Sequence, residues 1–192
     1  PVAVLELNKI FGQAPKAIAF AEDGLNAYVL AAHSFQVSRI PLKSLLDKAD
    51  APNYVPVVVD QTIEPTDRVQ IGQDPLSEGA RLGRRTFHYA RNDRLAKDNQ
   101  FACATCHLDG GDDKLTWFIT GGARQTPLLS GRLLGTGPFN WKGTENELQS
   151  NMKDTVHRMG GIGLADQELV VLEQYLLVGL PPAAPNPNTV AP

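Results

Sequence analysis

The sequence predicts a mixed fold, in which a short β-rich segment precedes a larger helical one. Residues 1 to about 45 contain short runs that alternate apolar and polar side chains, with turn signals between them. Prolines then punctuate residues 50 to 74, which favours an irregular connection. Beyond this connection, apolar residues recur at spacings of three and four, the period of a helix packed on one face.

Four short strands are expected in the first segment. The turn signal Glu22-Asp23-Gly24 separates two of them and favours a hairpin. Short strands in succession suggest a meander, which in the simplest case packs against the rest of the chain. The expected strands are Val2–Leu7, Ala17–Phe20, Ala27–Leu30 and Phe35–Ile40, with a further short strand possible at Val57–Val59.

Three helices are expected in the second segment. The first begins at Asp74-Pro75, because aspartate is a good N-cap and proline a good first helical residue. The second covers Glu145–Arg158, and the third runs from Asp166, a natural N-cap, to Leu177. The last ten residues, 183–192, are rich in proline and predict an extended tail.

Composition and charge exclude several classes of protein. The 192 residues carry a net charge of −3, so no broad positive field exists and no nucleic-acid partner is expected. The longest apolar stretches, such as Tyr175–Leu180, are far shorter than a bilayer span, so no transmembrane segment is expected. The first residue is Pro1 rather than methionine, which favours a processed chain or part of a longer chain or complex.

The most informative motif is Cys103-Ala104-Thr105-Cys106-His107. On a helical turn, residues at i, i+3 and i+4 share a face, so both cysteines and His107 would point the same way. Two thiols at this spacing can add to the two vinyl groups of a porphyrin, while the imidazole reaches the iron from one side. This is the attachment signature of c-type haem. The sequence therefore predicts one covalent haem c.

Other uses of a cysteine pair explain less of this motif. A structural zinc site requires four ligands, and the chain has no second cysteine pair. A thioredoxin-like dithiol belongs in a βαβ context, which the flanking sequence lacks. A plain disulfide or two buried thiols would leave His107 unexplained.

Met159 is the expected sixth ligand of the iron. A methionine opposite a histidine raises the reduction potential and suits electron transfer, and the glycine-rich Gly160–Gly163 could bring its thioether to the iron. Met152 lies seven residues earlier on the same helical face and is an alternative ligand or a core side chain. His157 could instead complete a bis-histidine site, or the iron could stay open, which would permit peroxide chemistry.

Residues 76–182 resemble the cytochrome c domain of di-haem cytochrome c peroxidases, of MauG-like proteins and of propeller–cytochrome fusions. The resemblance implies an all-α cytochrome c domain whose first and last helices cross at Gly83, with Phe87 packed near Leu172, Tyr175 and Leu176. The matching stretches are Gly83–Phe87, the pentapeptide, Arg124–Pro127, Pro138–Gly143, and Met159 with the glycines that follow.

The same resemblance implies roles for three further residues. Arg124 is a candidate partner for a haem propionate, because a guanidinium matches a carboxylate bidentately. Trp117 and Trp141 could donate their indole N–H groups or wall the haem pocket. The peroxidases carry a second haem domain with its own pentapeptide, whereas this chain has one. The resemblance therefore favours the electron-transfer half of such an enzyme.

The first segment carries a pattern around its Asp-Gly turn that comprises Pro15, Ile18, Ala19, Asp23, Gly24, Tyr28 and Val29. In this pattern the segment resembles one blade of a YVTN-type β-propeller. The organisation that the resemblances imply is a blade remnant over 1–49, a linker over 50–75, the cytochrome c domain over 76–182 and the tail over 183–192.

Single-electron transfer by the covalent haem is the expected function, with no catalytic residue in this chain. The alternative is the electron-transfer half of a peroxidase-like haem enzyme, whose active site lies elsewhere or at an open iron. A redox partner protein is expected, and the basic segment Arg81–Lys97 could steer an acidic one. Proteins that this one resembles acquire haem outside the cytoplasm, which implies a periplasmic or extracellular location.

Overall fold

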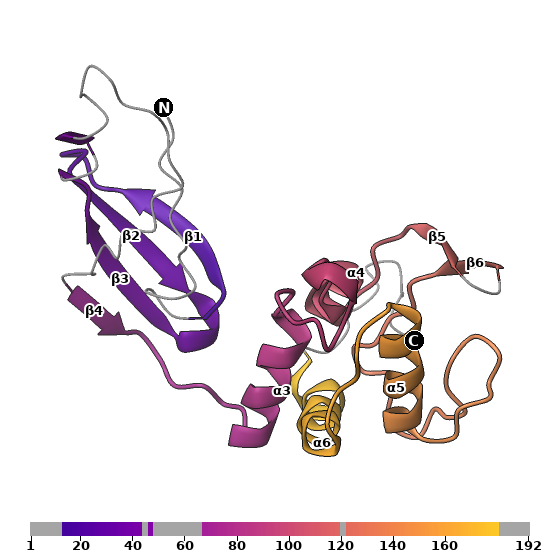
Figure 1. The fold of residues 1–192 in the computed structure, drawn as a ribbon. Helices are drawn as coiled ribbons and strands as arrows, with labels where there is room; N and C mark the ends of the chain where they lie inside the picture. Colours follow the sequence, from indigo (N-terminus) through magenta and orange to yellow (C-terminus); the bar gives the residue numbers. More distant parts are fainter. Residues whose placement is uncertain (1–12, 44–45, 48–66, 120–121, 181–192) are drawn as a thin grey trace, which may run out of the picture. The chain divides into compact units, whose positions relative to one another are not determined.

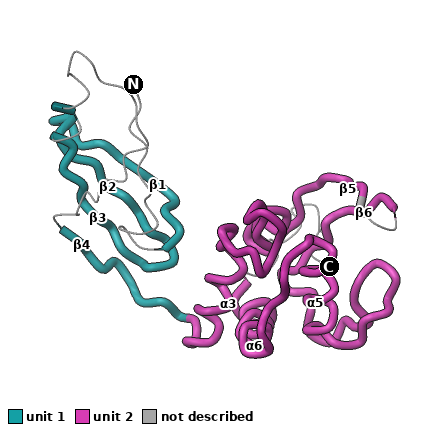
Figure 2. The backbone as a smooth tube through the Cα atoms, in the orientation of Figure 1, with its two compact units in different colours: residues 1–75 teal, residues 76–192 magenta. Residues whose placement is uncertain are grey.

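The computed structural model describes residues 13–43, 46–47, 67–119 and 122–180. The chain divides into two compact units, Pro1–Pro75 and Leu76–Pro192, which Figure 2 shows in teal and magenta. Three expected elements lie outside the described residues: the strands Val2–Leu7 and Val57–Val59 and the tail at 183–192.

The first unit contains an antiparallel sheet whose four strands lie in sequence order (Figure 1). The predicted strands at 17–20, 27–30 and 35–40 are confirmed, each with ends displaced by one or two residues. The fourth strand pairs with the third and lies within the segment expected to be a linker. The strands are β1 (Pro15–Phe20), β2 (Asn26–Ala31), β3 (Gln36–Pro41) and β4 (Asp67–Gln70).

The register of this sheet follows from its turn and its buried face. Gly24 has φ of +65°, and Asp23 Oδ1 accepts a hydrogen bond from the Leu25 N–H at 2.8 Å, so this turn closes the β1–β2 hairpin. Along β2, Ala27 and Val29 are fully buried whereas Tyr28 between them is 41% exposed. A slip of one residue would expose the buried set, which specifies the pairing.

The second unit is not the all-α cytochrome c domain that the resemblance implies. It holds the helices α3 (Glu78–His88), α4 (Cys103–Cys106), α5 (Leu148–Arg158) and α6 (Asp166–Gln174), and α6 continues into a π-helical turn, Tyr175–Gly179. It also holds an antiparallel hairpin of β5 (Thr116–Ile119) and β6 (Gly122–Gln125), which Figure 1 shows beyond α4. The physical reason is the run Thr116–Ile119, which is β-branched and aromatic and therefore suits a strand. With the sheet of the first unit, the chain is mixed α and β.

The first and last helices of this unit pack directly on each other. A Cβ atom at Gly83 would collide with the carbonyl oxygen of Val171 in α6, so only glycine permits this approach. The rings of Phe87 and Tyr175 lie 5.3 Å apart, edge to face. The close approach at Gly83 and the packing of Phe87 are confirmed. The buried cluster at this crossing comprises Phe87, Leu148, Met152, Leu169, Leu172, Tyr175 and Leu176.

Helix caps differ from those that the sequence indicates. α3 begins at Glu78, after the N-cap Ser77, whose Oγ accepts a hydrogen bond from the Ala80 N–H at 3.2 Å. The expected cap, Asp74, therefore lies ahead of the helix. In α6, Asp166 is the first helical residue rather than the cap, and Glu168 Oε2 accepts from the Ala165 N–H at 2.7 Å. At the start of each helix, a nearby side chain accepts a hydrogen bond from a backbone N–H that has no partner within the helix: Ser77 does so in α3 and Glu168 in α6.

Ser77→Ala is expected to lower the free energy of unfolding by about 1 kcal/mol, because the Ala80 N–H loses its acceptor. Denaturant titration of the full chain measures the change. Ser77→Asp retains an acceptor and should stay close to the parent. Equal losses in both variants would contradict the capping role.

None of the helices among the described residues combines the length and the apolar character that a bilayer crossing requires.

Candidate functional site

The two cysteines lie at the two ends of α4, a single helical turn, and both thiols are free. The Ala102 N–H donates to Thr105 Oγ1 at 3.0 Å, which holds the start of the turn. At its end, the His107 N–H donates to the Cys103 carbonyl at 2.9 Å. These bonds place both cysteines on one helical turn, which ends at His107, a C-cap residue whose backbone is not helical.

The surroundings of both thiols oppose ionisation. Cys103 retains some exposed surface but packs against the buried cluster, and burial raises its pKa to about 11. The pKa of Cys106 is also raised, by burial first and then by the carboxylate of Asp113 beside it. Reactive dithiols instead lower the pKa of the attacking cysteine. The environment therefore does not resemble that of a thiol–disulfide catalyst.

The imidazole of His107 is held in its neutral form. Burial lowers its pKa, against the opposing effects of the backbone at Gly111 and Pro127 and of the nearby carboxylates. Its Nδ1 is buried and makes no hydrogen bond of good geometry, even though the Pro127 carbonyl lies near the ring. A histidine that binds a metal is neutral and commonly donates its other ring N–H to a carbonyl. His107 and Pro127 suit that arrangement.

The structure brings together three of the residues that the resemblance implies. Trp117 and Arg124 are direct partners across the β5–β6 hairpin. The guanidinium carbon of Arg124 lies 5.9 Å from the ring centroid of Trp141, a cation–π contact. Trp141 belongs to a loop that is closed by a backbone hydrogen bond of 2.6 Å from the Phe139 N–H to the Glu145 carbonyl. An aromatic and cationic group thus forms from two separate segments.

Asp113 links this group to the pentapeptide. Its Oδ2 accepts a hydrogen bond from the Trp117 indole N–H at 2.7 Å, and its charge acts on Cys106 and His107. Since the indole N–H is already donated to Asp113, Trp117 is suited to wall a pocket rather than to bind a propionate. Asp113 is absent from the residues that the sequence singles out for the haem. The turn-forming pair Asp112-Asp113 is its one signal in the sequence.

Met159 caps the end of α5 and is 39% exposed. Its carbonyl accepts from the Lys97 N–H at 3.1 Å, and Gly161 lies so close to the backbone of Leu95 that a Cβ atom there would clash. These contacts anchor the glycine-rich segment to the chain that precedes the pentapeptide. None of the described contacts joins Met159 to His107 itself.

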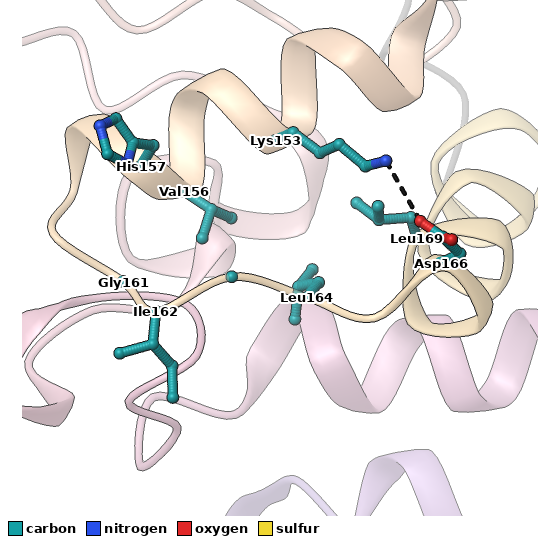
Figure 3. A pocket seen from close by; sticks show the side chains of 9 residues that line it. Lys153, Val156, His157, Gly161, Ile162, Leu164, Asp166 and Leu169 are labelled. Atoms are coloured by element: carbon teal, nitrogen blue, oxygen red, sulfur yellow. Dashed lines mark hydrogen bonds and ion pairs between the residues drawn. The ribbon is translucent and has the colours of Figure 1, made fainter.

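Met152 and His157, the two side chains that could replace Met159 at the iron, have different surroundings. Met152 is buried in the helix cluster, at 7% exposure, and would have to leave it to reach an iron. His157 borders a cavity of about 300 Å³ between α5, the glycine-rich segment and the start of α6. Figure 3 shows Lys153 reaching across this cavity to Asp166. Neither the pentapeptide nor the group formed by Trp117, Arg124 and Trp141 lines this cavity.

Within the part of the chain that the structure describes, no three His, Cys, Asp or Glu side chains gather where they could hold a bare metal ion. A haem makes smaller demands, because the porphyrin provides four ligands and the protein provides only the axial ones. Comparisons with models of protein families, with curated proteins and with solved structures find no match. A functional assignment therefore depends on the site.

Proposed function

We propose that this chain binds one haem c covalently and transfers single electrons through it. The pentapeptide carries the proposal: two free thiols on one helical turn, next to a neutral imidazole whose buried Nδ1 lacks a partner. This combination of donors is what covalent haem requires from a protein.

Each residue of the site has a distinct part in this proposal. Cys103 and Cys106 would hold the haem through two thioether bonds, and His107 and Met159 would bind its iron. Arg124 would offer a guanidinium to a propionate, while Trp117 and Trp141 would wall the haem pocket. When bound, the haem supplies an iron that alternates between its ferrous and ferric states.

Exposed apolar side chains support the presence of a large apolar group. Phe118, Leu134 and Leu108 are 87%, 82% and 68% exposed, and all three belong to the segments that follow the first cysteine. A contiguous patch of such side chains marks a surface that a ligand or partner covers, whereas single exposed ones are ordinary. A covalently held porphyrin would also add apolar contacts to the modest core of this unit.

A redox partner and a location outside the cytoplasm are part of the same proposal. The resemblance of the pentapeptide and of Arg124–Pro127 to cytochrome c domains supports both, since such domains receive haem after export and pass electrons to other proteins.

A redox titration of the purified chain tests electron transfer. The expected result is one reversible transition of the haem bands, with one electron taken up per chain. A haem that does not cycle reversibly would contradict the proposal. Sustained turnover of peroxide at the iron would instead support the peroxidase-like alternative.

Met159→Ala is expected to remove the weak sulfur-to-iron band of the oxidised protein and to lower its reduction potential, because methionine ligation raises that potential. The variant should also bind cyanide readily. Met152→Leu is the matched control and should retain the parent spectrum, because its side chain lies in the core. Loss of the band in the Met152 variant alone would assign the ligand to Met152. A parent protein that binds cyanide readily would indicate an open iron.

A further inference from the structure

Asp113 uses both of its carboxylate oxygens to hold the segment that follows the pentapeptide. Oδ1 accepts a hydrogen bond from the Leu115 N–H at 3.0 Å, and Oδ2 accepts from the Trp117 indole N–H at 2.7 Å. Hydrogen bonds to an ionised acceptor are shorter and stronger than those between neutral groups. The carboxylate therefore fixes both the turn before β5 and the orientation of the Trp117 ring.

The position of Trp117 in turn affects Arg124. The two residues are directly opposed in the hairpin and project from the same face. The Arg124 guanidinium lies 5.9 Å from the centroid of the Trp141 ring, and its Nη1 donates to the Ala123 carbonyl at 2.8 Å. A change in the tilt of Trp117 would shift the cation that the proposed function assigns to a propionate.

Asp113 also lies beside the Cys106 thiol, with which it shares a hydrogen bond. Its bonds to Leu115 and Trp117 involve no sulfur atom, so they are compatible with Cys106 as a thiol or as a thioether. The neighbouring Asp112 has the same charge, but it accepts a hydrogen bond from the Lys114 N–H at 3.2 Å rather than from the tryptophan. Substitution of Asp112 therefore provides a matched control, which removes a neighbouring negative charge but leaves the hydrogen bond to Trp117 intact.

We propose that Asp113 is a positioning residue, which holds Trp117 and, through the hairpin, Arg124 beside a haem attached at Cys106. The inference rests on the proposed function, and it adds a residue that lies outside the haem-attachment motif itself.

Amide hydrogen exchange on the purified full chain tests the contact itself. Asp113→Ala is expected to speed exchange of the β5 and β6 amides about tenfold, because the hairpin loses a charged acceptor. Asp113→Asn retains one acceptor oxygen and should give an intermediate rate, whereas Asp112→Asn should stay within about twofold of the parent. Unchanged hairpin exchange in Asp113→Ala, or equal effects at both aspartates, would overturn the proposal.

Tryptophan fluorescence then tests the position of Trp117 relative to the haem. The chain has two tryptophans, so Trp141→Phe leaves Trp117 as the single reporter, whose emission a nearby haem quenches. In this background, Asp113→Ala should raise the emission, whereas Asp112→Asn should not. Unchanged emission in Asp113→Ala, with quenching intact, would overturn the positioning role. Absence of quenching in the Trp141→Phe parent would contradict the proposed function, while hydrogen exchange would still report on the Asp113 contact.

Discussion

Replacing both Cys103 and Cys106 by alanine is expected to abolish covalent haem in this protein. Each thioether needs one sulfur atom, and the chain has no other cysteine. A haem stain of the denatured chain on a gel measures the result, because only covalently attached haem survives denaturation. The double variant should show no stain, and each single variant should retain one bond and a weaker signal.

A folding control accompanies this experiment. Cys103 packs against the helix cluster, so its replacement could reduce stability as well as haem attachment. Far-ultraviolet circular dichroism of the double variant should still show the helices and strands of the parent. A stained band from the folded double variant would contradict the covalent site.

Gly83→Ala is expected to destabilise the second unit by about 3 kcal/mol, which is a large effect for one methyl group. The added Cβ atom would collide with the backbone carbonyl of Val171 and with Tyr175, so α3 and α6 would have to separate. Backbone atoms in packed helices cannot move aside as a flexible side chain can. Denaturant titration followed by circular dichroism measures the loss.

Gly79→Ala is the matched control for that substitution. It changes the same residue type in the same helix, but its Cβ atom would meet only the end of the Gln174 side chain. A rotamer change in Gln174 relieves this contact, and alanine favours the helix by up to about 1 kcal/mol over glycine. Gly79→Ala should therefore be neutral or stabilising. Similar losses for both glycines would contradict the close crossing of α3 and α6.

Periodic patterns in the sequence predict much of this fold. The buried alternation of Ala27 and Val29 and the helical spacing that leads to Phe87 each reflect one packed face, so β2 and α3 follow from them. The strand β4 has no such signal, because all four of its residues are exposed. It is held by backbone pairing with β3 and by the Arg39–Asp67 ion pair at 2.7 Å.

The hairpin β5–β6 is not predicted, for a different reason. Thr116–Ile119 has the composition of a strand, but the resemblance to an all-α domain favours a loop there, and the resemblance is wrong on this point. Likeness in short motifs constrains the residues near a cofactor more strongly than the segments between them.

The candidate site also has features that the sequence predicts and features that it does not. The pentapeptide is recognisable because its residues are contiguous in the sequence, although only the two cysteines belong to the helical turn and His107 is its non-helical C-cap. The Asp113–Trp117 bond depends on a turn at Lys114 with φ of +56°, a conformation that the residue type does not predict. The contact of Arg124 with Trp141 joins segments far apart in sequence, and only the folded chain reveals it.

The intact mass of the purified chain, taken after denaturation and removal of free haem, shows whether haem is bound covalently. We expect the mass of the polypeptide plus one haem, with the added mass located on the peptide that contains Cys103 and Cys106. The mass of the polypeptide alone, from cells that attach haem to a control cytochrome, would contradict this expectation.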